Sequence, residues 1–205
     1  MPYTLFLASK SPSRKMLLTQ ALIPFTVIEQ TADEAQCDWS LPLATLVQNI
    51  AEYKMHHVVL PAGTVEGEFC FVLTADTLSQ DKTDGFILGK PIDRADAIAQ
   101  IKRGRMGSRL CTAFYLNKYV WQNNEWHIKM SHTECVQVDY TFFIPDNLID
   151  WYLDNSIGLQ AAGAVAVEEC GSQFLQSIQG SHSGLIGLPM FELRQALTAC
   201  GFFNT

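Results

Sequence analysis

Long apolar runs, paired cysteines and basic side chains are all scarce in this sequence. The longest apolar runs, Tyr3–Ala8 and Ala161–Val167, are far shorter than the roughly 18 to 20 residues that span a bilayer. We therefore expect no membrane-spanning helix and no membrane partner. The first residues, MPYTLFLASKSPSRK, also lack the basic flank and apolar core of a secretory signal peptide.

The six cysteines lie far apart and form no C-x-x-C pair: Cys37, Cys70, Cys111, Cys135, Cys170 and Cys200. This spacing does not indicate a disulfide framework or a zinc site. We interpret them as reduced thiols in a cytoplasmic protein. His132 and Cys135 lie three apart on a predicted strand, so they face opposite sides and are poorly placed to share a metal.

Basic residues are outnumbered, with 14 Lys and Arg against 21 Asp and Glu and a net charge of −7. Binding to duplex nucleic acid or to anionic lipid is therefore not expected, and an anionic ligand would need a local basic pocket. Hydrophobic residues make up 48% and charged residues 17%, which excludes disordered and collagen-like chains. The 205 residues suffice for one domain, or for two small lobes that share a cleft.

Helical and β-prone segments alternate early in the chain, and hairpins dominate its middle. This order predicts an α/β fold with a mixed sheet. Predicted strands are Tyr3–Ala8, Phe25–Ile28, Phe69–Thr74, Phe86–Leu88, about Arg109–Trp121, Trp126–Phe143, Gly163–Val167 and Phe174–Ile178. Predicted helices begin at Pro12, Ser40, Asp93, Pro145 and Phe191, and Glu29–Asp38 is predicted to be a loop.

The segment from Ser9 to Arg14 joins a predicted strand to a helix start. Ser11 is a suitable N-cap, and Pro12 fits the first helical position. Free backbone N–H groups, the hydroxyl of Ser9 and the charge of Arg14 could together bind phosphate. An ordinary capped helix explains the same residues equally well.

Three further residues are chemically notable. Lys54 falls on the apolar stripe of its predicted helix, where snorkelling of its stem is the usual explanation. Asp76 directly follows a β-prone run, the position where open α/β sheets place ligand-binding groups, although an ordinary turn aspartate also fits. Lys90, in Gly89-Lys90-Pro91, is most simply a solvated turn residue.

Several segments taken together resemble one family. These are LASKSPSRKMLL at 7–18, Asp33-Glu34, AEYK ending at Lys54, TADT at 74–77, GKP at 89–91, AAGAVAVEECG at 161–171 and IGLP at 186–189. They are similar, in the same order, to the motifs of the Maf family of nucleoside triphosphate pyrophosphatases. The resemblance covers nearly the whole chain.

The resemblance implies a fold similar to that of the inosine-triphosphatase-like enzymes: a mixed twisted sheet with flanking helices and a central cleft. Residues 1–205 would form a single Maf-like domain of two lobes around the substrate. It also implies hydrolysis of a non-standard or modified nucleoside triphosphate to the monophosphate and pyrophosphate, assisted by Mg²⁺, Mn²⁺ or Co²⁺. Members of the family often form homodimers, but the sequence locates no interface.

Roles carried over from the resemblance fall into three groups. Asp76 would be the catalytic carboxylate and, with Glu34, would hold the metal. The phosphates would be bound by Ser9, Arg14, Lys54 and Lys90. The base would be selected by Ser13, Thr77 and Glu168.

The three base-selecting positions give conflicting indications. Ser13 stands where many members have an arginine, and Val165 stands where the pyrimidine-type motif has a tyrosine. Glu168 replaces a glutamine of members that act on thymidine and uridine triphosphates, and a carboxylate, which only accepts hydrogen bonds, suits the adjacent donors of guanine. Thr77, in contrast, matches the pyrimidine branch.

Two other classes of function compete with the enzyme interpretation. One is a catalytically weak nucleotide-binding regulator of cell division, which the family's association with septum formation suggests. The other is a scaffold that binds no nucleotide, for which no thermal shift with any triphosphate is expected.

Overall fold

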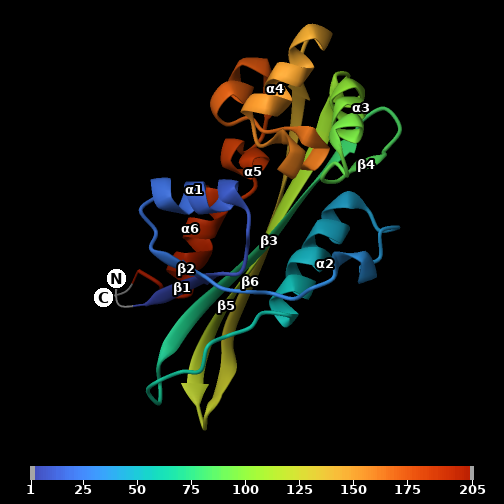
Figure 1. Ribbon diagram of the computed structural model, residues 1–205. Helices are drawn as coiled ribbons and strands as arrows, with labels where there is room; N and C mark the ends of the chain where they lie inside the picture. Colours follow the sequence, from blue (N-terminus) through green and yellow to red (C-terminus); the bar gives the residue numbers. More distant parts are fainter. Residues whose placement is uncertain (1–2, 204–205) are drawn as a thin grey trace. The chain divides into compact units, whose positions relative to one another are not determined.

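The computed structural model describes residues 3–203, which form a mixed α/β structure with one seven-stranded sheet (Figure 1). Its hydrogen-bonded order is β2-β1-β3-β5-β6-β7, with β4 paired to β3. The strands are β1 (Thr4–Leu7), β2 (Phe25–Val27), β3 (Phe69–Asp81), β4 (Ile87–Leu88), β5 (Ser108–Gln122), β6 (Glu125–Phe142) and β7 (Leu175–Gln179). Strand β1 is parallel to β2 and β3, whereas the pairs β3–β4 and β6–β7 are antiparallel, which confirms the predicted mixed sheet.

Six α-helices and five short 3-10 turns accompany the strands in this part of the chain. The helices are α1 (Pro12–Gln20), α2 (Leu43–His56), α3 (Arg94–Gly104), α4 (Ile149–Asn155), α5 (His182–Ile186) and α6 (Met190–Ala199). The 3-10 turns are η1 (Glu34–Gln36), η2 (Asp146–Leu148), η3 (Gly158–Gln160), η4 (Ala162–Ala164) and η5 (Glu169–Phe174). Among residues 3–203, no helix combines the length and apolar character needed to cross a membrane.

The chain divides into two compact units. Unit 1 comprises the residues up to Asp76, Ala113–Cys135 and the residues from Gly187 onward. Unit 2 comprises Thr77–Thr112 and Val136–Ile186. Strands β3, β5 and β6 each contribute residues to both units.

The core of unit 1 is built on its parallel strands. Leu5 and Leu7 of β1 and Phe71 and Leu73 of β3 are fully buried. Val72, between Phe71 and Leu73, is also fully buried, so β3 is covered on both faces, which requires a continuous apolar run.

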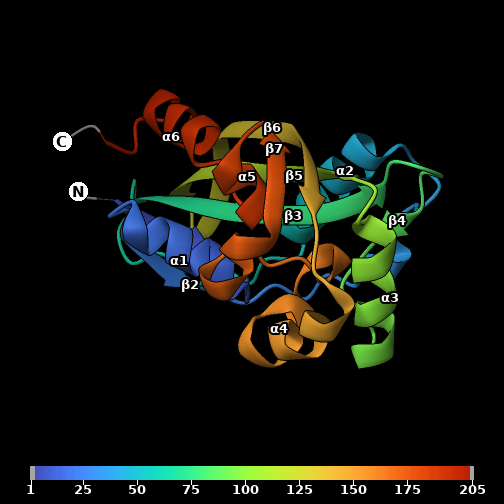
Figure 2. The ribbon, with the colours of Figure 1, turned by 90° about the horizontal axis from the view of Figure 1, so that it is seen from above.

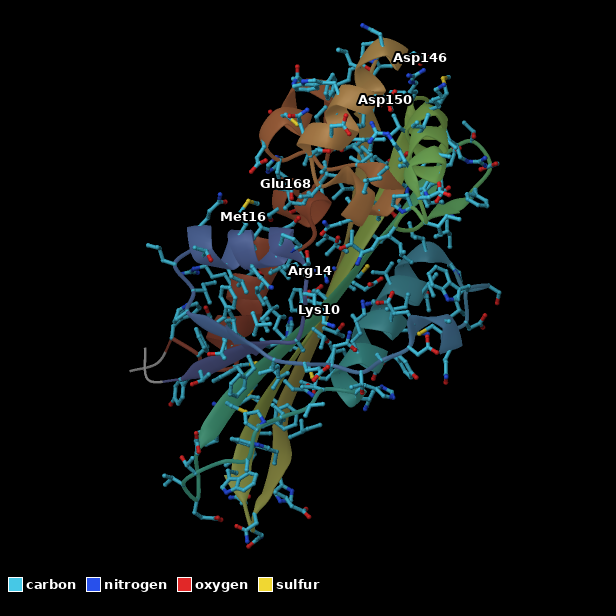
Figure 3. All side chains as sticks on the ribbon, in the orientation of Figure 1. Lys10, Arg14, Met16, Asp146, Asp150 and Glu168 are labelled. Atoms are coloured by element: carbon cyan, nitrogen blue, oxygen red, sulfur yellow. The ribbon has the colours of Figure 1, made fainter. Side chains whose placement is uncertain are left out.

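Unit 2 is built around an aromatic core and a pair of helices. Tyr152 of α4, Phe142 of β6 and Phe174 pack with their rings edge to face. Helices α3 and α4 lie side by side in both ribbon views (Figures 1 and 2). Arg94 of α3 contacts Asp150 of α4 at 2.8 Å, and Asp150 is labelled in Figure 3.

Local sequence signals predicted most of the elements, misassigned one and missed α5. Strand β3 also continues to Asp81, so Asp76 lies within the strand and not after it. The Ser11 hydroxyl accepts a hydrogen bond from the Arg14 backbone N–H at 3.4 Å, so the helix start at Pro12 is confirmed. The predicted strand Gly163–Val167 is wrong. Gly163 and Ala164 have φ values of 69° and 56°, which turn the backbone into η4 because left-handed residues cannot continue a strand. The predicted loop Glu29–Asp38 contains the 3-10 turn η1.

Candidate active site

The loop between β1 and α1 is held against β3 by its backbone. The Ala8 N–H donates to the Leu73 carbonyl at 2.9 Å, which extends the β1–β3 pairing by one residue. The Ser9 hydroxyl accepts a hydrogen bond from the Ser11 N–H at 3.3 Å. The loop therefore reaches the N-terminus of α1, where the positive end of the helix dipole favours an anion.

Arg14 is fixed from two directions within unit 1. Its Nη1 donates to Ser9 Oγ at 3.2 Å, and its Nε donates to the Gly187 carbonyl at 2.9 Å. Only 9% of its surface is exposed, and this burial lowers its pKa, while the charges of Asp76 and Glu34 oppose that shift. Figure 3 shows Lys10 and Arg14 at the end of α1 that follows β1. The guanidinium is thus a buried, positioned cation beside two carboxylates.

Lys54 and Asp76 form a buried ion pair between α2 and β3. Lys54 Nζ lies 2.6 Å from Asp76 Oδ1, and each side chain is 8% exposed. The Thr74 hydroxyl donates to the Ala51 carbonyl at 2.7 Å. Thr74 and Asp76 lie on one face of β3, and Ala51 and Lys54 lie one turn apart on α2. The threonine contact therefore fixes the register that brings Lys54 to Asp76.

Glu34 is a second carboxylate on the same ammonium group. Its Oε1 lies 2.8 Å from Lys54 Nζ, and its side chain is 43% exposed. It is the first residue of η1, which the Asp33 side chain caps by accepting from the Ala35 N–H. The Trp39 indole N–H donates to the Glu34 carbonyl at 3.1 Å. Turn η1 and Trp39 therefore hold Glu34 at the open side of the ion pair.

The two carboxylates retain capacity for a cation or for water. Asp76 Oδ2 is buried and has no hydrogen-bond partner among residues 3–203. A buried oxygen without a hydrogen-bond partner costs desolvation free energy. Such oxygens occur at sites that bind a ligand, an ion or a water molecule. Within the same residues, no three His, Cys, Asp or Glu side chains gather as a metal cluster. Asp76 and Glu34 thus suit a hard divalent cation that takes its remaining ligands from phosphate and water.

Cys37 lies within electrostatic range of this group and was not singled out by the sequence. Burial raises the pKa of its thiol, and the charges of Glu34 and Asp76 raise it further, whereas Lys54 lowers it. The thiol is therefore protonated and weakly nucleophilic at neutral pH.

Thr77 of β3 belongs to unit 2, where it has a fixed hydrogen-bond direction. Its hydroxyl lies 2.9 Å from the Thr112 hydroxyl, and Thr112 in turn donates to the Gly184 carbonyl at 2.8 Å. Because the Thr112 proton is committed to that carbonyl, Thr77 is the donor of the first bond.

Lys90 and Glu168 also belong to unit 2, on two segments that are tied together. The Gly163 N–H donates to the Gly89 carbonyl at 3.0 Å, which anchors the turn that carries the exposed Lys90 to the loop before Glu168. Glu168 Oε1 is buried without a hydrogen-bond partner in the described part of the chain. Its carboxylate is therefore a second candidate for binding a ligand.

The structure brings together five of the sequence-predicted residues in unit 1: Ser9, Arg14, Glu34, Lys54 and Asp76. Ser13 is buried on α1 in the same unit, and Thr77, Lys90 and Glu168 belong to unit 2. Sequence reasoning missed the supporting roles of Thr74, Trp39 and Gly187. Gly187 lies in the quoted IGLP segment, but a contact made by a backbone carbonyl leaves no signature in side-chain identity.

A family model and the sequence relatives indicate one family. The family model described as Maf-like protein matches residues 4–200. A nucleoside triphosphate pyrophosphatase of Trichormus variabilis is 36% identical over 93% of this chain and 90% of its own. A dTTP/UTP pyrophosphatase of Dechloromonas aromatica is 31% identical over 97% and 98%. A solved HAM1 protein from Coxiella burnetii covers 96% of this chain and 99% of its own, with a TM-score of 0.40 and 12% identity. On the family model and these sequence relatives, the chain belongs to the Maf-like protein family.

Proposed function

We propose that this protein is a nucleoside triphosphate pyrophosphatase that hydrolyses the bond between the α and β phosphates. The observation that carries the proposal is the buried group of Lys54, Asp76 and Glu34, with Arg14 in electrostatic range. The names of the relatives from Trichormus variabilis and Dechloromonas aromatica support the same reaction. The products would be a nucleoside monophosphate and pyrophosphate.

Cationic side chains would bind the polyphosphate. A triphosphate carries about four negative charges at neutral pH, and charge grows on the leaving pyrophosphate. Arg14 and Lys54 would neutralise part of this charge, with Lys90 contributing from its turn. The Ser9 hydroxyl and the first N–H groups of α1 would orient the same phosphates. This arrangement allows an acidic protein of net charge −7 to bind an anion.

A divalent cation fits the carboxylates of Asp76 and Glu34, since Asp76 Oδ2 is buried without a partner among the residues described. When bound, Mg²⁺, Mn²⁺ or Co²⁺ would polarise the phosphoryl oxygens as a Lewis acid.

Asp76 would be the catalytic carboxylate. The Asp76 oxygen that does not hold the cation would accept a proton from a water molecule while the water oxygen attacks the α-phosphorus. The bond from the α-phosphorus to the bridging oxygen breaks, and that oxygen leaves with the pyrophosphate. The proton then passes from Asp76 to solvent, which restores the carboxylate.

The base would be read in unit 2 by Glu168 and Thr77, with Ser13 of α1 as a third contributor. The buried, unpartnered Glu168 Oε1 favours a base with hydrogen-bond donors, such as guanine. The relative from Dechloromonas aromatica is instead named for dTTP and UTP. A ranked substrate panel separates these two classes.

The experiment combines that panel with isotope labelling. Purified protein is incubated with standard and modified triphosphates and each of the three metals, and the phosphate products are identified. Hydrolysis in H₂¹⁸O should place the label in the nucleoside monophosphate, because water attacks the α-phosphorus. Release of orthophosphate and a diphosphate would contradict the proposal.

Asp76→Asn tests the catalytic assignment. We expect kcat to fall at least about 100-fold, because the amide cannot accept the proton of the attacking water. Asp154→Asn, at an exposed carboxylate on α4, is the matched control and should retain activity. Unchanged turnover in Asp76→Asn would refute the assigned role.

We further propose a homodimer and a two-lobed domain around the substrate, which the family resemblance implies, and a cytoplasmic location, which the spacing of the six cysteines suggests. Light scattering of the purified protein measures the first, and fractionation of the source cells measures the last.

A further inference from the structure

We propose that the ammonium group of Lys54 occupies the cation position of the active site, so that the divalent metal enters with the triphosphate and not before it. The proposal rests on the proposed function only for the identity of the nucleotide. It concerns how the residues of this chain control metal binding.

The geometry places one cation between two carboxylates. Lys54 Nζ lies 2.6 Å from Asp76 Oδ1 and 2.8 Å from Glu34 Oε1. These are charge-assisted hydrogen-bond distances. A metal ion bound to the same oxygens would approach the ammonium group closely, because all three groups converge on one point. Lys54 must therefore leave Asp76 Oδ1 and Glu34 Oε1 before a metal can bind to these two oxygens.

The charge of the site is already balanced without a metal. Lys54 and Arg14 contribute +2, Asp76 and Glu34 contribute −2, and the sum is zero. A free divalent cation would add +2 beside two buried positive side chains and would also lose its hydration shell. Repulsion and desolvation both oppose this step.

A bound triphosphate offsets both the repulsion between the cations and the desolvation of the metal. Its phosphate oxygens bring about four negative charges and supply the metal ligands that the carboxylate pair lacks. They also offer Lys54 a new anionic partner, so the ammonium group can exchange carboxylate for phosphate without losing its neutralising charge. The Glu34 contact should open first, because Glu34 is 43% exposed whereas Asp76 is 8% exposed.

The test measures Mn²⁺ binding without nucleotide, by the loss of the free-ion electron paramagnetic resonance signal. Lys54→Met removes the charge and keeps most of the stem, so it should bind Mn²⁺ at least about tenfold more tightly than the wild type. Lys54→Arg keeps the charge and should bind as weakly as the wild type. The double variant Lys54→Met/Asp76→Asn should not show this increase in Mn²⁺ affinity. That result would assign the increase to the site that contains Asp76.

A second arm uses the wild-type protein and does not depend on the variants folding. Mn²⁺ is titrated with and without a triphosphate analogue whose α–β bridge is a methylene group. Weak binding by the protein alone, together with tight binding by protein and analogue beyond the Mn²⁺ that the analogue binds without protein, supports the proposal. Equal affinity with and without it, or no gain in a folded Lys54→Met, overturns it.

The two proposals can fail separately. If no nucleotide is hydrolysed but Lys54→Met gains Mn²⁺ affinity, the proposed function fails and the inference about Lys54 stands. If the protein releases pyrophosphate but the wild type binds Mn²⁺ tightly without nucleotide, the proposed function stands and the inference about Lys54 fails.

Discussion

At the scale of single residues, Arg14 shows why the type of cation matters and not only its charge. Its guanidinium donates to two acceptors at once, Ser9 Oγ and the Gly187 carbonyl. A lysine ammonium carries its three N–H donors on one nitrogen and cannot reproduce this planar fork. The position of the positive charge therefore depends on a side chain that reaches both acceptors.

Arg14→Lys is expected to raise the KM for the triphosphate by about 10- to 100-fold, the equivalent of one lost charge-assisted hydrogen bond. Steady-state kinetics measure the effect, and a thermal melt checks that the fold is intact. Arg194→Lys, at an exposed position of α6, is the matched control. An unchanged KM would show that Arg14 does not bind the phosphates.

Glu168→Gln tests base selection with nearly constant side-chain volume. The amide can both donate and accept, so preference should move from guanine-like toward uracil-like bases. A well-made base contact contributes about 1 to 3 kcal/mol of discrimination. The ratio of kcat/KM between the two bases measures the change, and an unaltered ranking would remove Glu168 from base recognition.

At the scale of elements, Tyr152 of α4 organises the segment that leads to Glu168. Its buried hydroxyl donates toward the carbonyls of Ala164 and Ala166 and accepts from the Ala166 N–H at 2.7 Å. Burial is the main cause that raises the pKa of Tyr152 to about 12. The hydroxyl thus stays protonated and fixes a stretch without regular hydrogen bonding.

Tyr152→Phe should reduce the free energy of unfolding by about 1 to 3 kcal/mol, because it leaves the Ala166 N–H buried without its acceptor. Urea denaturation measures this loss. Tyr3→Phe, at a partly buried tyrosine of unit 1, provides the comparison for removing a hydroxyl. Equal stability of wild type and Tyr152→Phe would show that another group replaces the hydroxyl.

Local sequence signals were sufficient to predict the elements whose conformation depends on neighbouring residues. Ser11 and Pro12 predict the start of α1. The position of Lys54 in an apolar stripe indicates a snorkelling side chain, whereas the structure gives its ammonium group two carboxylate partners, Asp76 and Glu34. The conformation of the segment after Gly163 could not be predicted from such local signals. Its residues favour a strand, but the φ of 69° at Gly163 and the tertiary contacts of Tyr152 impose a turn.

The candidate site was predictable to a similar extent. The charged side chains stand in motifs, so Arg14, Lys54 and Asp76 could be named from the sequence. The groups that position them could not. The Gly187 carbonyl is 173 residues from Arg14, and the Thr74 hydroxyl pairs with a carbonyl of α2. Such long-range contacts to the backbone depend on the completed fold.

At the scale of the whole molecule, the two units share strands β3, β5 and β6. Loss of one unit would release part of every shared strand and expose its apolar residues. We therefore expect both units to unfold in one cooperative transition.

Tryptophan fluorescence can test this expectation, because Trp151 lies in unit 2 and Trp39, Trp121 and Trp126 lie in unit 1. A variant that keeps only Trp151 and another that lacks only Trp151 should give coincident urea transitions. Far-ultraviolet circular dichroism of each variant is the control for altered stability. Two separate midpoints would contradict a single transition.

The route of the chain also limits how this protein can change through evolution. The backbone passes from one unit to the other after Asp76, Thr112, Cys135 and Ile186. No uninterrupted stretch of the gene therefore encodes either unit. A recombination event that replaced one of them would need several simultaneous breakpoints. The residues proposed to bind the phosphates and to read the base are therefore expected to diverge by point substitution.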